Sequence, residues 1–149
     1  MNLIEKKIQE LKTLKNKLPS EAKKIIFENK EYILDLIREK QLFELGVDGK
    51  GRKLKSYTPF TIAVKKNNNQ PTNRTTLNDT GAFYEGFNLL TTDQLSIGIF
   101  STDVKTPDLV EKYGSDIFIF TVDNNKKANE LILNELYKWL LNTPTFTRL

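Results

Sequence analysis

Apolar residues at helical spacing fill the first third of the chain and constrain its fold most strongly. In residues 2–17, leucines and isoleucines recur every three or four positions between charged residues, which predicts an amphipathic helix. Pro19 interrupts this pattern, and Ser20 is a suitable N-cap for a second helix that ends at Gly46. Two such helices either pack into the core or leave one face for a neighbouring subunit, because little chain remains to cover them.

Two turn-rich segments follow the N-terminal helices. The stretch "GVDGKGR" lacks the Lys-Ser/Thr ending of a phosphate-binding loop, so we interpret Asp48-Gly49 as a turn. Thr58 before a proline predicts a short helix through Lys66, although its β-branched residues are also compatible with a strand. The polar residues 67–76 are expected to form a long exposed connection, of the kind that a partner often orders.

The second half of the chain shows shorter patterns. Apolar residues alternate on either side of residues 91–93, which predicts a β-hairpin with one buried face. Pro107 begins an expected short helix that stops at Gly114. Residues 117–120 are all apolar and predict a third strand or an extended segment.

A last amphipathic helix is predicted near the C-terminus, with Asp123 or Asn124 as its cap. Helices at both ends of a small antiparallel sheet with a central hairpin place the chain in the α+β class. We expect one domain over residues 1–149 in three parts: a helical N-terminal arm at 1–45, an α+β body at 46–141 and a tail at 142–149.

Two missing residue types exclude several kinds of chemistry. The chain has no Cys and no His, which excludes thiol catalysis, Ser-His triads, disulfides and the usual zinc sites. No apolar run approaches the roughly 18 residues of a membrane span, and the first residues do not resemble a signal peptide. We therefore expect a protein made in the cytoplasm, with no membrane partner, no cofactor and no metal.

Positive charge is concentrated in the N-terminal third. Residues 1–55 hold 14 Lys and Arg against 9 Asp and Glu, a net charge of +5, whereas residues 56–149 hold 9 against 10, a net charge of −1. Acids alternate with the lysines, which favours a solvated helix face. The alternative is a nucleic-acid-binding accessory protein that uses these basic helices, although no recognition motif supports it.

The triplet Asp79-Thr80-Gly81 is also found at the catalytic carboxylate of aspartic proteases, where two copies meet. This chain has one copy, preceded by polar residues instead of a buried strand, so a protease is the weaker interpretation. We interpret the triplet as a cap or turn. One helical turn after it puts Phe83 and Phe87 on the same side, facing the core.

The same stretch resembles a known family. Leu77, Asp79, Thr80, Gly81, Phe83 and Phe87 look like the "L-x-D-T-G-x-L/F-x-x-S-F/I" segment of phage virion-morphogenesis and tail-completion proteins. The order of the motifs "LFELGVDGKGR", "YTPFT" and "LVEKYG" also fits, and the resemblance covers roughly residues 30–141. The stretch 41–87 is especially similar to the version from phages and prophages of Bacteroidales. The family often carries Arg-Pro-Phe after the "YG" element, where this chain reads "SDIFIF".

The resemblance implies a structural virion protein of a tailed bacteriophage, without enzymatic activity. Such proteins form closed rings of six or twelve copies at the head–tail junction, as neck connector or tail-completion subunits. The implied partners are portal, adaptor and tail proteins, with nonspecific contact to genomic DNA, in the virion and in the host cytoplasm during assembly. Candidate interface residues lie in the polar loop and the tail: Asn67, Asn68, Asn69, Gln70, Arg74, Thr143 and Phe146.

Overall fold

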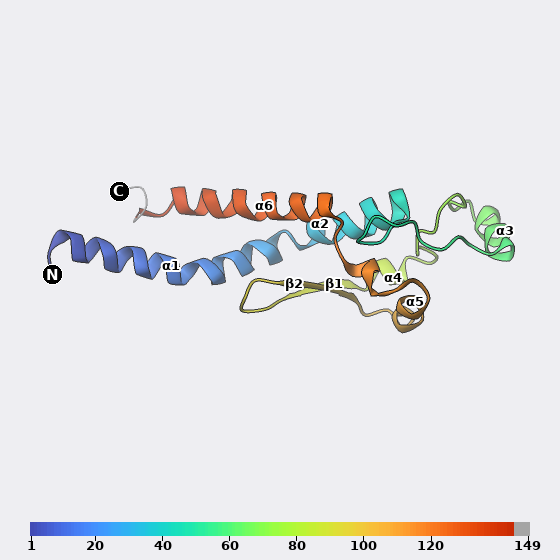
Figure 1. Ribbon diagram of the computed structural model, residues 1–149, viewed down its shortest axis with the longest axis horizontal. Helices are drawn as coiled ribbons and strands as arrows, with labels where there is room; N and C mark the ends of the chain where they lie inside the picture. Colours follow the sequence, from blue (N-terminus) through green and yellow to red (C-terminus); the bar gives the residue numbers. More distant parts are fainter. Residues whose placement is uncertain (145–149) are drawn as a thin grey trace.

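The computed structural model describes residues 1–144, which form an elongated α+β fold with an arm and a body (Figure 1). The arm consists of α1 (Leu3–Glu28) and α6 (Val122–Leu141), which lie side by side and run in opposite directions. The body contains the elements between them. Residue 1 and residue 144 therefore lie at the same end of the arm, away from the body.

Helix α1 begins with a capping box and continues through its proline. The Glu5 amide donates to Asn2 Oδ1 at 2.9 Å, and the Asn2 amide donates to Glu5 Oε2 at 3.0 Å. Pro19 lies inside the helix on its exposed side, where the lost backbone bond is left to solvent. The prediction that Ser20 caps a new helix is wrong: its hydroxyl donates back to the Lys17 carbonyl at 3.0 Å.

The helical path is instead interrupted at Asn29, which has φ −108° and whose side-chain amide donates to the Ile25 carbonyl. Helix α2 (Lys30–Asp35) then passes into η1 (Leu36–Leu45), a segment with the wider π-helical turn. Gly46 ends it with φ +63°, as predicted. A side chain at this position would collide with the Thr75 carbonyl oxygen, 2.9 Å from an added Cβ.

The core forms where α2 and η1 meet the hairpin. Strand β1 (Phe87–Thr91) pairs with β2 (Ile97–Ser101) in an antiparallel sheet, which confirms the predicted hairpin. Its inner face lies over α2. A single apolar cluster joins these elements: Ile26, Ile33, Leu34, Ile37, Leu42, Leu54, Leu77, Phe83, Tyr84, Phe87, Leu89 and Ile117. The body thus has the central core of the molecule.

Four short helices complete the body: α3 (Pro59–Asn67), α4 (Ala82–Glu85), α5 (Thr106–Tyr113) and the 3₁₀ helix η2 (Ser115–Phe118). Helix α3 begins at Thr58 and α5 ends at Gly114, as predicted. Helix α4 confirms the expected turn: the Phe83 and Phe87 rings are buried and meet edge to face at 5.1 Å. Residues 117–120 were predicted to form a third strand or an extended segment, and the strand is wrong. Ile117 and Phe118 end a 3₁₀ helix that places Ile117 in the core, and Ile119 after it is extended, with φ −102° and ψ 137°.

A buried amide pair connects the start of α6 to η1. Thr121, not Asp123 or Asn124, caps α6 by accepting the Asn124 amide at 3.2 Å, which corrects the predicted cap. The Asn124 side chain instead donates to the Leu36 carbonyl and to Gln41 Oε1, at 2.8 and 3.0 Å. Gln41 in turn donates to the Ile119 carbonyl. These bonds satisfy groups that would otherwise be buried without partners.

The glycine-rich loop is a turn, as predicted. The Gly51 amide donates to the Asp48 carbonyl, and the Asp48 carboxylate accepts the Lys50 and Arg52 amides. Arg52 Nε also donates to this carboxylate at 3.0 Å. Burial alone raises the pKa of Asp48, but these bonds outweigh it and leave the pKa below its ordinary value.

The structure divides the chain differently from the sequence prediction. Residues 30–45 belong to the body core and α6 belongs to the arm, so the arm is made from both ends of the chain. The connection at residues 67–76 is only partly exposed, since Thr75 and Thr76 are buried. Among residues 1–144, no helix is both long enough and apolar enough to cross a bilayer.

Candidate functional site

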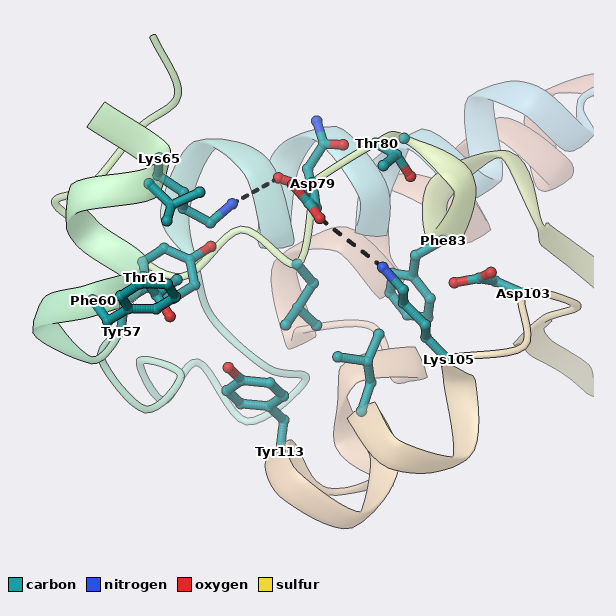
Figure 2. Close-up of a pocket in the computed structure, with 15 residues that line it drawn as sticks. Tyr57, Phe60, Thr61, Lys65, Asp79, Thr80, Phe83, Asp103, Lys105 and Tyr113 are labelled. Carbon is teal, nitrogen blue, oxygen red and sulfur yellow. Dashed lines mark hydrogen bonds and ion pairs between the residues drawn. The ribbon is translucent and has the colours of Figure 1, made fainter. Parts of the chain in front are cut away.

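A pocket opens directly at the Asp-Thr-Gly turn (Figure 2). Helix α3 forms one wall, α5 forms the opposite wall, and the turn at residues 77–81 lies between them. The cavity has a volume of about 270 Å³. Its apolar lining comes from these three segments and from the residues next to them: Tyr57, Phe60, Val64, Leu77, Phe83, Leu109 and Tyr113.

A buried lysine fixes the turn to α3. Lys65 Nζ donates to the Asn78 carbonyl at 2.9 Å and to Gln70 Oε1 at 3.3 Å. It also lies 4.9 Å from the centroid of the Tyr57 ring, in the position of a cation–π contact. Gln70 Nε2 donates to the Asp79 carbonyl at 2.8 Å, so two successive residues of the turn are held, one by α3 and one by the loop that follows it.

The strand-like segment before the turn is held in a strained conformation. Leu77 has φ +57°, a left-handed value that is uncommon for a leucine. The residue before it is fixed from both sides: the Thr76 amide donates to Tyr57 Oη at 2.9 Å, and Tyr84 Oη donates to the Thr76 carbonyl. Burial raises the pKa of Tyr84, so its hydroxyl stays a donor. Strain of this kind is often found beside functional sites.

The acidic side chains of the pocket differ in their surroundings. The Asp79 carboxylate is 64% exposed and lies 4.0 Å from Lys105 Nζ. It does not cap the turn, which corrects that part of the prediction. Instead Thr80 Oγ1 accepts the Ala82 amide, and Gly81 adopts φ +91°. Asp103 lies across the pocket, and its Oδ2 atom is shielded from solvent without a hydrogen-bond partner among residues 1–144.

The predicted interface residues lie in different environments. Asn67, Asn68 and Asn69 are exposed at the end of α3. Gln70 is bonded within the chain, as described above, and Arg74 is too: its Nε donates to the Phe43 carbonyl at 2.6 Å.

Of the two predicted tail residues, the structure describes Thr143 but not Phe146. Thr143 is half-buried and donates to the Trp139 carbonyl at 2.8 Å, and Phe146 lies outside the described residues. Sequence reasoning did not find Phe60, Asp103, Lys105 and Tyr113, because these residues meet only through the tertiary fold. Of these four residues, only Phe60 could have been found from its local sequence, because it follows the proline of "YTPFT".

The carboxylates of the described residues do not form two of the arrangements that catalytic sites use. Within residues 1–144 no three carboxylate side chains come together as a metal site would require. The exposed Asp79 carboxylate lacks the dry, paired setting that aspartic proteases give theirs. No family model, curated protein or solved structure matches the chain.

Proposed function

We propose that this chain is a structural subunit of a tailed bacteriophage that forms a ring at the head–tail junction, as a connector or tail-completion protein. The ordered motifs around Asp79-Thr80-Gly81 support the phage assignment. The observation that carries the ring assignment is an apolar face on the arm that no described residue covers.

That face lies on the distal arm, which we define as residues 1–18 of the N-terminal segment and residues 133–144 of the C-terminal segment. On α1, Ile4, Ile8 and Leu11 are exposed at 71%, 44% and 37% and form one stripe along the helix. On α6, Leu133 and Tyr137 are exposed at 63% and 59%, one helical turn apart.

The stripe on α1 continues into residues that the body covers. Ala22 and Ile26 lie on the same side of the helix and are each only 2% exposed. There the hairpin lies next to α1, and its turn pairs through Asp93 with Lys23 at 2.9 Å (Figure 1). Beyond the hairpin turn the same face is bare within the described chain. A second copy of the chain is the occupant we propose, because repeated head-to-tail contacts close into rings.

Sedimentation velocity of the full chain, alone and with the portal protein of the same phage, tests the proposal. We expect assemblies of six or twelve copies or a portal-bound ring. The double variant Ile4→Glu/Ile8→Glu keeps good helix formers but adds charge to the stripe, and it should sediment as a monomer. The control Val122→Glu changes a helical residue that is even more exposed, at 89%, but lies at the body end of α6, and this variant should assemble. A wild-type chain that stays monomeric and never joins the portal contradicts the proposal.

Nucleic-acid binding is a second candidate, favoured by four exposed lysines in the first 17 residues. Lys6, Lys12, Lys15 and Lys17 form no ion pair with any described residue. Helical spacing, however, puts Lys6 and Lys17 on one side of α1 and the other two on another side, so no single row faces a phosphate backbone. A duplex DNA shift assay over increasing salt separates the candidates: a dedicated binder holds duplex at moderate salt, whereas a ring subunit with incidental contact releases it.

The proposal includes the absence of catalysis. Asp79→Asn tests this point, because a protease using this carboxylate would lose all activity toward a peptide substrate. We expect no peptide hydrolysis by the wild-type chain and an unchanged fold in the variant, measured by circular dichroism.

A further inference from the structure

The pocket at the turn has the features of a site for one protein side chain. Its volume of about 270 Å³ lies just below the range of roughly 300–1,000 Å³ that is usual for small-molecule sites. Its walls are mostly apolar. Phe60 stands at the rim with 79% of its surface exposed, which is unusual for a phenylalanine on a folded domain and typical of a contact residue.

The charged groups of the pocket need a donor. Asp103 Oδ2 is shielded from solvent, and none of the described residues donates to it. Lys65 is already bonded to Asn78 and Gln70, and Lys105 Nζ lies 4.0 Å from Asp79 Oδ2. A buried carboxylate oxygen is normally hydrogen-bonded, and a guanidinium group supplies donors in the planar geometry that a carboxylate accepts. An aromatic ring next to an arginine would therefore fill the cavity and bring donors to the exposed Asp79 carboxylate, and to Asp103 once its side chain turns toward the pocket.

We propose that this pocket receives the C-terminal segment of a neighbouring copy, with Phe146 in the apolar cavity and Arg148 facing Asp103 and Asp79. The segment after Pro144 reads "TFTRL", which places the aromatic and the cationic side chain two positions apart. Side chains at that spacing point to the same side of an extended peptide. The inference rests on the proposed function, since it names the partner surfaces of the contact between subunits.

The segment must come from another copy. Pro144 lines a cavity together with Met1, at the end of the arm where the chain begins. The pocket is lined by α3 and α5, and these helices lie at the opposite end of the molecule (Figure 1). Helix α6 alone, with 20 residues, spans about 30 Å. Phe146 is two residues from Pro144, a reach of at most about 7 Å, so it cannot return to its own pocket. Arm-end to body-end contact is heterologous, the kind that builds rings when its rotation closes.

The first experiment titrates the full chain into a fluorescein-labelled peptide of residues 142–149 and follows fluorescence anisotropy. We expect saturable binding, at least about tenfold weaker for the peptide with Phe146→Ala and several-fold weaker with Arg148→Gln. In the chain, Phe60→Ala and Asp103→Asn should weaken binding to a similar degree. Phe27→Ala is the matched control, because Phe27 is also an exposed phenylalanine, at 51%, but lies on α1 outside the pocket. The inference is overturned if the peptide does not bind, or if Phe60→Ala and Asp103→Asn leave its affinity unchanged.

The second experiment places a benzoylphenylalanine photo-cross-linker at position 146 of the full chain and mixes it with isotope-labelled chain. Mass spectrometry should find cross-links between differently labelled copies, on α3 or α5. Cross-links confined to residues 6–17 of the same chain, or found only on a different protein, overturn the inference.

The two proposals can fail separately. If the chain assembles with the portal but Phe146→Ala leaves the assembly intact, the ring function stands and the tail contact is wrong. If the peptide binds the pocket but sedimentation shows only open chains of copies, the tail contact stands and the ring is wrong. If the full chain stays monomeric, both proposals are wrong.

Discussion

The body and the distal arm contain similar proportions of apolar residues, but the body buries them and the distal arm leaves most of them exposed. In the body, Ile33, Leu34, Ile37 and Leu42 have no exposed surface, and the buried amides of Gln41 and Asn124 are fully bonded. In residues 1–18, only Leu14 is buried. The body is stabilised by its own contacts, whereas the distal arm gains most of its apolar burial from a partner in our proposal. Stability of the isolated chain should therefore depend on the body and assembly on the arm.

The largest effect is expected from a core truncation in the body. Leu34→Ala should lower the free energy of unfolding by about 2–5 kcal/mol, because it leaves a cavity in a fully buried site. Ile8→Ala in the distal arm should change it by less than about 1 kcal/mol, since that side chain is already 44% exposed. Urea unfolding at a concentration where the chain is monomeric measures both. Equal losses of unfolding free energy would mean that the isolated chain depends on the packing of the arm as much as on that of the body.

A polar truncation at the junction of arm and body should rank second. Asn124→Ala removes the donor to the Leu36 carbonyl and to Gln41, and should destabilise the chain by about 2 kcal/mol. The neighbouring Asn125→Ala is its control, because Asn125 is exposed, and it should stay within about 0.5 kcal/mol of wild type. The comparison of the two urea midpoints is the measurement. A loss shared by both variants would point to helix propensity instead of the buried amides.

The Asp48 turn should give a smaller effect that depends on pH. The folded pKa of Asp48 lies below its ordinary value of 3.8, because bonds from Arg52 and Lys50 outweigh the effect of burial. Its contribution is therefore complete above pH 3.8 and is lost as the pH falls through the folded value. Asp48→Asn should destabilise the chain by about 1–2 kcal/mol at neutral pH, and by progressively less below pH 3.8. Urea midpoints across this pH range test it, and a pH-independent difference would argue against the charge.

The smallest effect is expected at the border, where the hairpin turn meets α1. Lys23 lowers the pKa of Asp93 through a hydrogen bond and its charge, but the carboxylate is fully exposed. Lys23→Gln should return that pKa toward 3.8 while the urea midpoint stays unchanged at about 0.15 M salt. Carboxyl NMR gives the pKa. A clear loss of stability would mean that this pair, and not the apolar contacts, fixes the hairpin against the arm.

The elements that could be predicted are those set by local chemistry. Thr58 before a proline, Gly46 and Gly114 mark helix ends wherever they occur, and the alternation around residues 91–93 leaves a hairpin as the simplest solution. The helix break predicted at Pro19 is wrong because a long helix tolerates a proline on its exposed side. The apolar residues 117–120 misled because a buried 3₁₀ turn and a buried strand have the same composition.

The candidate site was predictable only in part. The turn at Gly81 follows from its own residues, and the structure places it at the pocket. The walls at Phe60, Asp103 and Tyr113 come from segments far apart in the sequence, and their meeting depends on how α3 and α5 pack. The bare face of the distal arm was anticipated from the shortage of chain to cover two amphipathic helices. The position of this face could not be anticipated, because it depends on the pairing of α1 with α6 in the tertiary fold.

The wide turn of η1 makes this segment tolerant of a change in length. Each π-type bond spans one more residue than an α-type bond, so the segment holds length that an ordinary helix would not need. One extra residue in an α-helix would turn everything after it by roughly 100°, whereas the wider turn absorbs that residue locally. Deleting one residue from η1 would therefore let it tighten to an α-helix while α1 and α6 stay paired.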